Sequence, residues 1–182
     1  MPLVHVNAPG ATHSRKKAWA AFLVFVVFPG AAAGYYFGYN VGTVTLFVTD
    51  DEIAEFAHLN ITFSEIQVKS AGALTMSPWV TMPVDLQTID LVALRDNITA
   101  KIAGARLTAG TYSHLRIVVQ TAIGELKTGS NVSVEVPSGE LRTDASFQVR
   151  PQSSTDLLLR LHVVQTGVEY NLRPVFAGAT AL

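Results

Sequence analysis

Histidines are the residues of this chain that could most readily bind a transition metal, because the sequence contains no cysteine. Two of the five histidines, His114 and His162, fall on the polar positions of two segments whose alternation is typical of β-strands. If those strands pair, the two imidazoles could converge on one metal ion. No third ligand is spaced to join them, so we expect two solvated surface histidines and no metal site.

An acidic run, Asp50-Asp51-Glu52, follows the first strand-like segment. Hard cations such as Ca²⁺ are bound by several oxygen ligands, so a calcium site in this loop is one interpretation. Acidic side chains are also favoured at the N-terminus of a helix, where they interact with the helix dipole. We prefer the second interpretation, which predicts a short helix over residues 50–58.

The sequence lacks the common signatures of catalysis. It contains no Gly-rich phosphate loop, no nucleophile elbow and no helical motif with paired histidines. The lack of cysteine excludes thiol nucleophiles, disulfides, iron–sulfur clusters and a cysteine-linked lipid anchor. The net charge of −1 leaves no basic excess for the phosphates of a nucleic acid. We therefore expect no enzyme activity, no cofactor and no nucleic-acid partner.

Three N-glycosylation motifs occur in the chain, at Asn60, Asn97 and Asn131. With six asparagines and 28 serines and threonines in 182 residues, chance would give roughly one such motif. The excess indicates an exported surface, and coincidence in a threonine-rich β protein is the alternative.

The N-terminus carries the pattern of a membrane anchor. The basic cluster Arg15-Lys16-Lys17 precedes residues 18–39, which contain no charge. A helix of that length spans roughly 33 Å, enough to cross a bilayer core. Basic residues mark the cytoplasmic side of such helices. The sequence therefore predicts a cytoplasmic tail at residues 1–17, one transmembrane helix (a signal anchor) at 18–39, and an extracytoplasmic domain at 41–182 on the cytoplasmic membrane.

Glycines recur every four residues along and just after this segment, at Gly30, Gly34, Gly38 and Gly42. That spacing places them on one face of a helix, and small residues let a second transmembrane helix approach closely. We therefore expect a retained anchor that packs against another membrane protein or a second copy. The alternative is a signal peptide cleaved after Ala33, where small residues also fit a cleavage site.

From Val41 onward, apolar and polar residues alternate with a period of two, as in half-buried β-strands. The alternation changes phase at Ser64-Glu65, which predicts a β-bulge there. Turn signals separate about eight or nine short strands. The sequence predicts an all-β domain, an antiparallel Greek-key sandwich of the immunoglobulin-like or prealbumin-like kind, with helix confined to residues 50–58 and 86–95.

Tyr112 opens a strand directly after the turn at Ala109-Gly110. This arrangement resembles the tyrosine corner of Greek-key sandwiches, in which the phenol bonds back to an upstream backbone group. The alternative is a surface tyrosine that happens to begin a strand. We expect Trp79 and Phe147 in the core.

Several segments of the exported part carry a family resemblance, namely Gly42-Thr43-Val44-Thr45-Leu46, Leu59 to Ile66, Val84-Asp85-Leu86, Leu107 to Val119, and Leu172-Arg173-Pro174-Val175. Together they resemble a prokaryotic family of exported sandwich domains, frequent in archaeal and bacterial envelope proteins and catalogued as a domain of unknown function. The resemblance covers about residues 42–177 and rests on turns and core positions, so it implies a fold and no catalytic residues. This chain departs from typical members because it has no lipoprotein cysteine.

These observations predict a non-catalytic, single-pass envelope protein whose sandwich domain has a structural or interaction role, for example as an accessory subunit of a membrane protein complex. A second hypothesis is a secreted filament or surface-layer subunit, cleaved near Ala33, that assembles by β-strand addition. A third, a ligand binder or enzyme, rests only on His114, His162 and the acidic run.

Overall fold

The computed structural model describes residues 39–51, 53, 55–72, 79–85, 87–96 and 98–181. The residues from Asn40 onward belong to one compact unit. Among the described residues, no helix is long and apolar enough to span a membrane. The predicted cytoplasmic tail, and the predicted transmembrane helix up to residue 38, lie outside the described residues.

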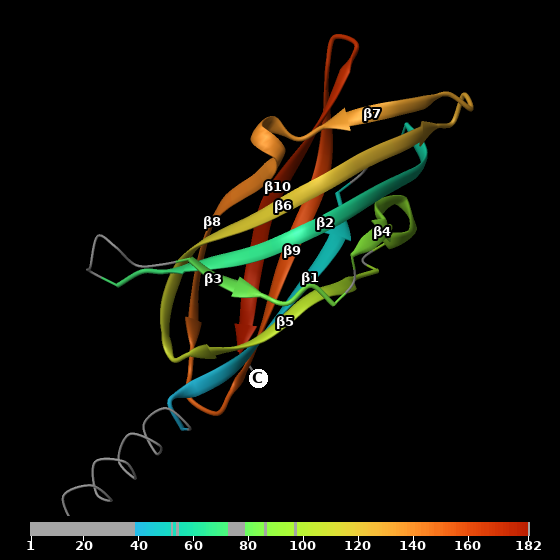
Figure 1. Ribbon diagram of the computed structural model, residues 1–182. Helices are drawn as coiled ribbons and strands as arrows, with labels where there is room; N and C mark the ends of the chain where they lie inside the picture. Colours follow the sequence, from blue (N-terminus) through green and yellow to red (C-terminus); the bar gives the residue numbers. More distant parts are fainter. Residues whose placement is uncertain are drawn as a thin grey trace, which may run out of the picture. The chain divides into compact units, whose positions relative to one another are not determined.

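The domain is all-β, as predicted (Figure 1). Its sheet has the strand order β3-β2-β6-β7-β10-β9-β1-β5, and β4 and β8 pair with β2 and β6 beside this path. Val84, just after β3, bridges to Ala103 of β5, so the sheet nearly closes on itself. The strands are β1 (Val41–Asp50), β2 (Phe56–Ser70), β3 (Trp79–Met82), β4 (Thr88–Asp90), β5 (Ala100–Thr108), β6 (Gly110–Leu126), β7 (Asn131–Glu135), β8 (Glu140–Val149), β9 (Ser154–Thr166) and β10 (Glu169–Ala181), with 3-10 turns η1 (Leu91–Leu94) and η2 (Pro137–Gly139).

The sheet is mixed, so the prediction of a purely antiparallel arrangement was wrong. β1 runs parallel to β9, and β7 runs parallel to β10. Parallel partners need a long crossover, and about a hundred residues separate β1 from β9. Local alternation and turn signals carry no information on pairings at that sequence distance, which explains the error.

The core forms where the inward positions of the strands meet. Leu46, Ile61, Ile117 and Leu159 come from four different strands, and each is completely buried. Their neighbours in sequence point outward, which confirms the period-two prediction. Burial of each such side chain contributes roughly 1.5–3 kcal/mol, and this hydrophobic gain fixes which face of each strand is outward.

The predicted β-bulge in β2 is confirmed. Phe63 lies opposite Val119 of β6 and Glu65 lies opposite Val118, so Ser64 is the extra residue. The bulge restores the inward direction of the apolar residues that follow it, because Ile66 is completely buried. It therefore also sets the outward direction of the polar residues on the second half of β2.

Both helix predictions need correction. Within residues 50–58, β1 ends at Asp50 and β2 already begins at Phe56. Phe56 is buried in the core as an inward-facing residue of β2. Over residues 86–95, strand β4 is followed only by the single turn η1. Asp90 caps this turn by accepting a hydrogen bond from the backbone nitrogen of Val92 at 3.1 Å.

Gly42 does not belong to a helix face, which corrects one part of the predicted glycine stripe. It lies in β1 opposite Leu107 of β5. A Cβ atom at Gly42 would lie 2.4 Å from the backbone oxygen of Arg150, so glycine is needed here for the close approach of two backbones. Gly30, Gly34 and Gly38 lie outside the described residues.

Candidate functional site

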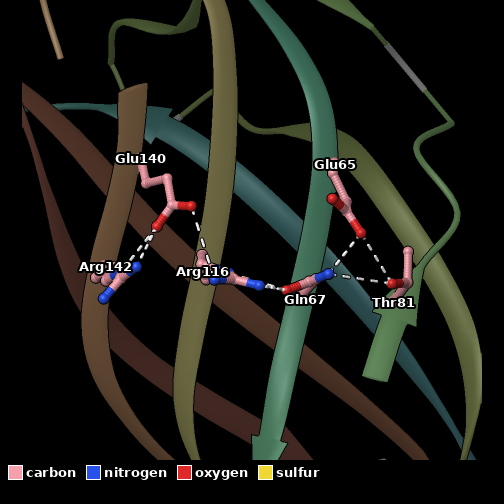
Figure 2. A network of polar contacts seen from close by, with 6 residues as sticks. All are labelled: Glu65, Gln67, Thr81, Arg116, Glu140 and Arg142. Atoms are coloured by element: carbon pink, nitrogen blue, oxygen red, sulfur yellow. Dashed lines mark hydrogen bonds and ion pairs between the residues drawn. The ribbon is translucent and has the colours of Figure 1, made fainter. Parts of the chain in front are cut away.

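A row of polar side chains crosses the outer face of β3, β2, β6 and β8 (Figure 2). The register aligns them, because Gln67 lies opposite both Thr81 and Arg116, and Arg116 lies opposite Arg142. Side chains two positions apart on a strand share a face, so Glu65 and Glu140 join the same row. We call this row the polar ladder, and its members are Glu65, Gln67, Thr81, Arg116, Glu140 and Arg142.

Gln67 is the centre of the polar ladder and is only 9% exposed. Its side-chain nitrogen donates to Glu65 Oε1 at 2.5 Å and to Thr81 Oγ1 at 3.3 Å. Its side-chain oxygen accepts from Arg116 Nε at 2.8 Å and from Arg116 Nη2. Because both polar atoms of the amide are occupied, the amide has one defined orientation and orders its neighbours.

The charges of the polar ladder compensate one another. Arg116 and Arg142 lie opposite each other on paired strands, where their like charges repel. Glu140 lies between them, with Oε1 3.7 Å from Arg116 Nη1 and Oε2 accepting from Arg142 Nε at 2.8 Å and Nη2 at 2.5 Å. Glu65 lies on the other side, where it accepts from Gln67 and Thr81. The two carboxylates balance the two guanidinium groups in charge, so the ladder is formally neutral.

An aromatic side chain borders the polar ladder. The guanidinium carbon of Arg116 lies 4.7 Å from the centroid of the Trp79 ring, which is the geometry of a cation–π contact. The Trp79 ring also meets the imidazole of His114 edge-on, with the centroids 6.5 Å apart. Trp79 is therefore a half-buried residue that packs against a surface arginine, and its predicted place in the core was wrong.

A groove of about 770 Å³ opens where the polar ladder ends at β8. Residues of η2 and β8 form one side of it, and residues of β9 and β10 form the other. The polar part of its lining is Ser138, Glu140, Arg142, His162 and Arg173, and leucine and proline side chains complete it. The Nδ1 atom of His162 is shielded from solvent and has no hydrogen-bond partner in the part of the chain that the structure describes.

Tyr112 is buried at the start of β6. Its hydroxyl donates to the backbone oxygen of Thr108 at 3.0 Å, a bond that runs back four residues across the turn. Its ring stacks on the core residue Phe147, with the centroids 5.2 Å apart. Burial raises the pKa of Tyr112, because a phenolate is poorly solvated there. These contacts are those of a tyrosine corner.

The two histidines considered as joint metal ligands do not meet. His114 lies on β6 and His162 on β9, and these strands are not paired. His114 Nε2 lies 3.3 Å from Asp144 Oδ1, and His114 Nδ1 lies 2.7 Å from Ser113 Oγ. Within the part of the chain that the structure describes, no three His, Asp or Glu side chains are grouped to hold a metal ion.

The acidic run that ends β1 faces arginines. The Asp50 carboxylate is 1% exposed and lies 3.6 Å from Arg95 Nε, and Asp51 Oδ1 lies 3.9 Å from Arg160 Nη1. Burial raises the pKa of Asp50, and backbone groups and Arg95 oppose this effect. Glu52 lies outside the described residues. The described carboxylates thus have guanidinium partners, and the helix invoked to explain them is absent from residues 55–58.

Two of the three glycosylation motifs fall on described residues. Asn60 is exposed on β2, and Asn131 is exposed at the first position of β7. Asn97 lies outside the described residues. Glycosylation at these positions stays a prediction.

Sequence reasoning missed the polar ladder. Its members are separated by up to 77 positions (Glu65 to Arg142), and only the register of four strands brings them together. The available signal was the repeated spacing of two between polar residues, at Glu65 and Gln67 and again at Glu140 and Arg142.

Comparison with known proteins identifies a family and no activity. A family model described as "Domain of unknown function (DUF4382)" matches residues 41–174, which include the whole polar ladder. One solved structure, titled "Trapped Toxin", matches with 10% sequence identity and a TM-score of 0.19; the match covers 76% of this chain and 24% of that chain. A likeness this slight carries no argument. No curated protein matches the sequence.

Proposed function

The chain belongs to the DUF4382 family of domains of unknown function, and we propose that it is a non-catalytic, membrane-anchored protein with an extracytoplasmic domain that binds another envelope protein. In this proposal residues 1–17 are a cytoplasmic tail, residues 18–39 are the anchor, and residues 41–182 are a sandwich domain. The basic cluster before a charge-free segment supports the orientation. The role is structural or interactive, as in an accessory subunit of a membrane complex.

The observation that carries the proposal is the polar ladder. Its donors and acceptors are held on rigid strands by one another, so little side-chain entropy is left to lose when a partner binds. The chemistry of the row also favours binding over catalysis. Arg116 and Glu140 are paired with each other, and Gln67 accepts from Nε and Nη2 of Arg116, so these groups are poorly placed to transfer protons.

A second candidate function is the secreted filament or surface-layer subunit that assembles by β-strand addition after cleavage near Ala33. Open strand edges favour it. In the described residues, β8 pairs only with β6, and β10 beyond Asn171 pairs only with β9. An open edge offers backbone donors and acceptors to a strand from another chain.

Copurification from membranes tests the first proposal. The tagged full chain is extracted in mild detergent, as wild type, as the ladder variant Gln67→Ala/Thr81→Ala, and as the control Gln148→Ala, which changes an exposed glutamine of β8 outside the ladder. We expect the wild type and the control to retain a partner and the ladder variant to lose most of it. Equal retention by all three would exclude the ladder as the binding face.

The intact mass of the same extracted protein separates the two candidates. A chain that retains residues 1–39 supports the anchor, and added mass would report glycans. A mature chain that begins at Gly34 would contradict the anchor and favour the filament subunit.

A further inference from the structure

The groove between β8 and β10 is the place where the sheet fails to pair. The N-terminal half of β6 pairs with β8 up to Val118, and β7 takes over from Ile123. Turn η2 joins β7 to β8 across this change, and Ser138 at its centre has a φ of 61°, a left-handed conformation. β7 then pairs with β10 over only two residues. The ladder is therefore interrupted between β8 and the rest of β10, although the two strands lie close together.

The outward side chains around this interruption are mainly cationic. Arg142 lies on β8 and Arg173 on β10, and among the described residues Glu140 is the one carboxylate in the lining. Glu140 is shared between Arg142 and Arg116, so it does not reach the second side of the groove. Arg173 is exposed and forms none of the ion pairs found among the described residues. The groove thus has a formal charge of +1, from two arginines and one glutamate. Residues 41–182 as a whole have a net charge of −4, from 10 basic and 14 acidic residues.

His162 adds an unused polar group to the same side. It lies opposite Arg173 in the β9–β10 ladder, on the outward face of β9. Its Nδ1 atom is shielded from solvent and has no hydrogen-bond partner among the described residues, which is unfavourable for a polar atom. A ligand that reaches this atom would supply the missing partner. As a neutral imidazole or as a cation, the ring can donate a hydrogen bond to an anionic oxygen.

The open edge decides what kind of ligand would fit. In the described structure the ladder partners of β8 lie on β6 alone, so the other edge of its groove-lining residues, Glu140 to Arg142, has no strand partner. Near the end of β8, the Gln148 backbone oxygen already accepts from Thr155 Oγ1 at 3.4 Å. On the facing strand, Pro174 has no backbone N–H, which weakens that edge as a template. Leu141 and Leu172 provide an apolar floor. An extended polypeptide can use a strand edge, an apolar floor and cationic rims together.

We propose that this groove binds an extended acidic polypeptide segment of the partner protein, with carboxylates at Arg173 and Arg142 and backbone hydrogen bonds to the edge of β8. This inference rests on the proposed function, because it names the chemistry of the partner. A carboxylate at Arg173 and His162 would form charge-assisted hydrogen bonds, and Arg142 would contribute from the opposite rim. Side chains on alternate positions of the segment would point to the leucines of the floor.

A labelled peptide of alternating valine and glutamate tests the inference by fluorescence anisotropy, with the full chain in detergent micelles. We expect saturable binding to the wild type and at least about tenfold weaker binding to Arg173→Ala, since one charge-assisted contact is lost. The control Arg106→Ala removes another exposed arginine, on β5, away from the groove. It should bind the peptide like the wild type.

Two further probes separate a peptide site from a simple anion site. The same peptide with lysine in place of glutamate should not bind, and a peptide with N-methylated backbone amides should bind at least about tenfold more weakly. Inorganic phosphate that displaces the peptide at equal concentration would overturn the inference, because the strand edge would then contribute nothing. No binding of the glutamate peptide to the wild type, or equal binding by Arg173→Ala, would overturn it as well.

Failure of this inference is distinguishable from failure of the proposed function. If the membrane-extracted chain retains a partner that the ladder variant loses, but the glutamate peptide does not bind, only the groove assignment is wrong. If the peptide binds as expected and no partner copurifies, the groove is a peptide site and the proposed role at the polar ladder is wrong.

Discussion

At the scale of single residues, the Tyr112 hydroxyl is the clearest structural contact. We predict that Tyr112→Phe lowers the free energy of unfolding by about 1 kcal/mol or more, because the Thr108 carbonyl loses a partner in a shielded place. Urea denaturation measures the change. The control Thr43→Val alters an exposed hydroxyl on β1 and should stay within about 0.5 kcal/mol of the wild type. An unchanged midpoint for Tyr112→Phe would remove the tyrosine corner from this account.

A second residue-scale prediction concerns the pair of His58 and Asp90, whose Nδ1 and Oδ2 atoms lie 2.7 Å apart. The hydrogen bond and charge of Asp90 raise the pKa of His58. Burial acts to raise the pKa of Asp90, but hydrogen bonds from His58 and from the backbone of Leu59 and Val92 outweigh it and lower that pKa.

The two shifts define a pH window. Because its pKa is lowered, ionised Asp90 stabilises the fold at pH values above the ordinary pKa of 3.8. This stabilisation is lost as the pH falls below 3.8 and through the lowered pKa. The raised pKa of His58 stabilises the fold below its ordinary value of 6.5, and that contribution is lost as the pH rises through the raised pKa. We predict that His58→Gln lowers the melting temperature more at about pH 5.5 than at about pH 8.5. An equal decrease at both pH values would contradict the role of the charged pair.

How far the sequence predicts the residues depends on the range of their contacts. The back-bonding of Tyr112 is local, and the turn before it was enough to predict it. Trp79 was misplaced because its partner Arg116 lies 37 positions away, and nothing local indicates that an outward tryptophan is covered by a guanidinium group. The sequence could not show that His114 and His162 lie on unpaired strands, because the order of the strands in the sheet has no local signal.

At the scale of elements, Gly42 shows how closely two segments approach. We predict that Gly42→Ala costs about 1–3 kcal/mol, because the new Cβ would meet the backbone oxygen of Arg150, which cannot move aside easily. Gly104→Ala is the matched control on the neighbouring strand β5. Its Cβ would meet the flexible end of Lys101 at 3.3 Å, so only a small change is expected. Equal midpoints for the two variants in urea would contradict the close approach.

The strands themselves were largely predictable, because burial of alternate residues is a local property. The bulge at Ser64 is the most informative case: a phase change in the sequence became an extra residue between Phe63 and Glu65. The acidic run misled the prediction, since its carboxylates pair with Arg95 and Arg160 from distant elements. The parallel pairings of β1 with β9 and of β7 with β10 have no local signal either.

At the scale of the whole molecule, the anchor and the domain are proposed to work together. We predict that Gly34→Leu weakens association of the full chain with a partner helix in the membrane, because a large side chain prevents close packing of two helices. Ala32→Leu makes the same small-to-large change on the opposite side of the expected helix and should matter little. Sizing of the detergent-extracted proteins measures the effect. Assemblies of unchanged size for Gly34→Leu would reduce the stripe to a processing signal.

The central claim is that the outer face marked by the polar ladder contacts a partner. A photoreactive residue placed at Thr81, at the end of the ladder, in the full chain within its own membrane tests this contact most directly. The same residue at Thr43, exposed on the outer face of β1, is the control. We predict a cross-linked species heavier than the chain from Thr81 and little from Thr43. No cross-link from Thr81, or equal products from both positions, would contradict the claim.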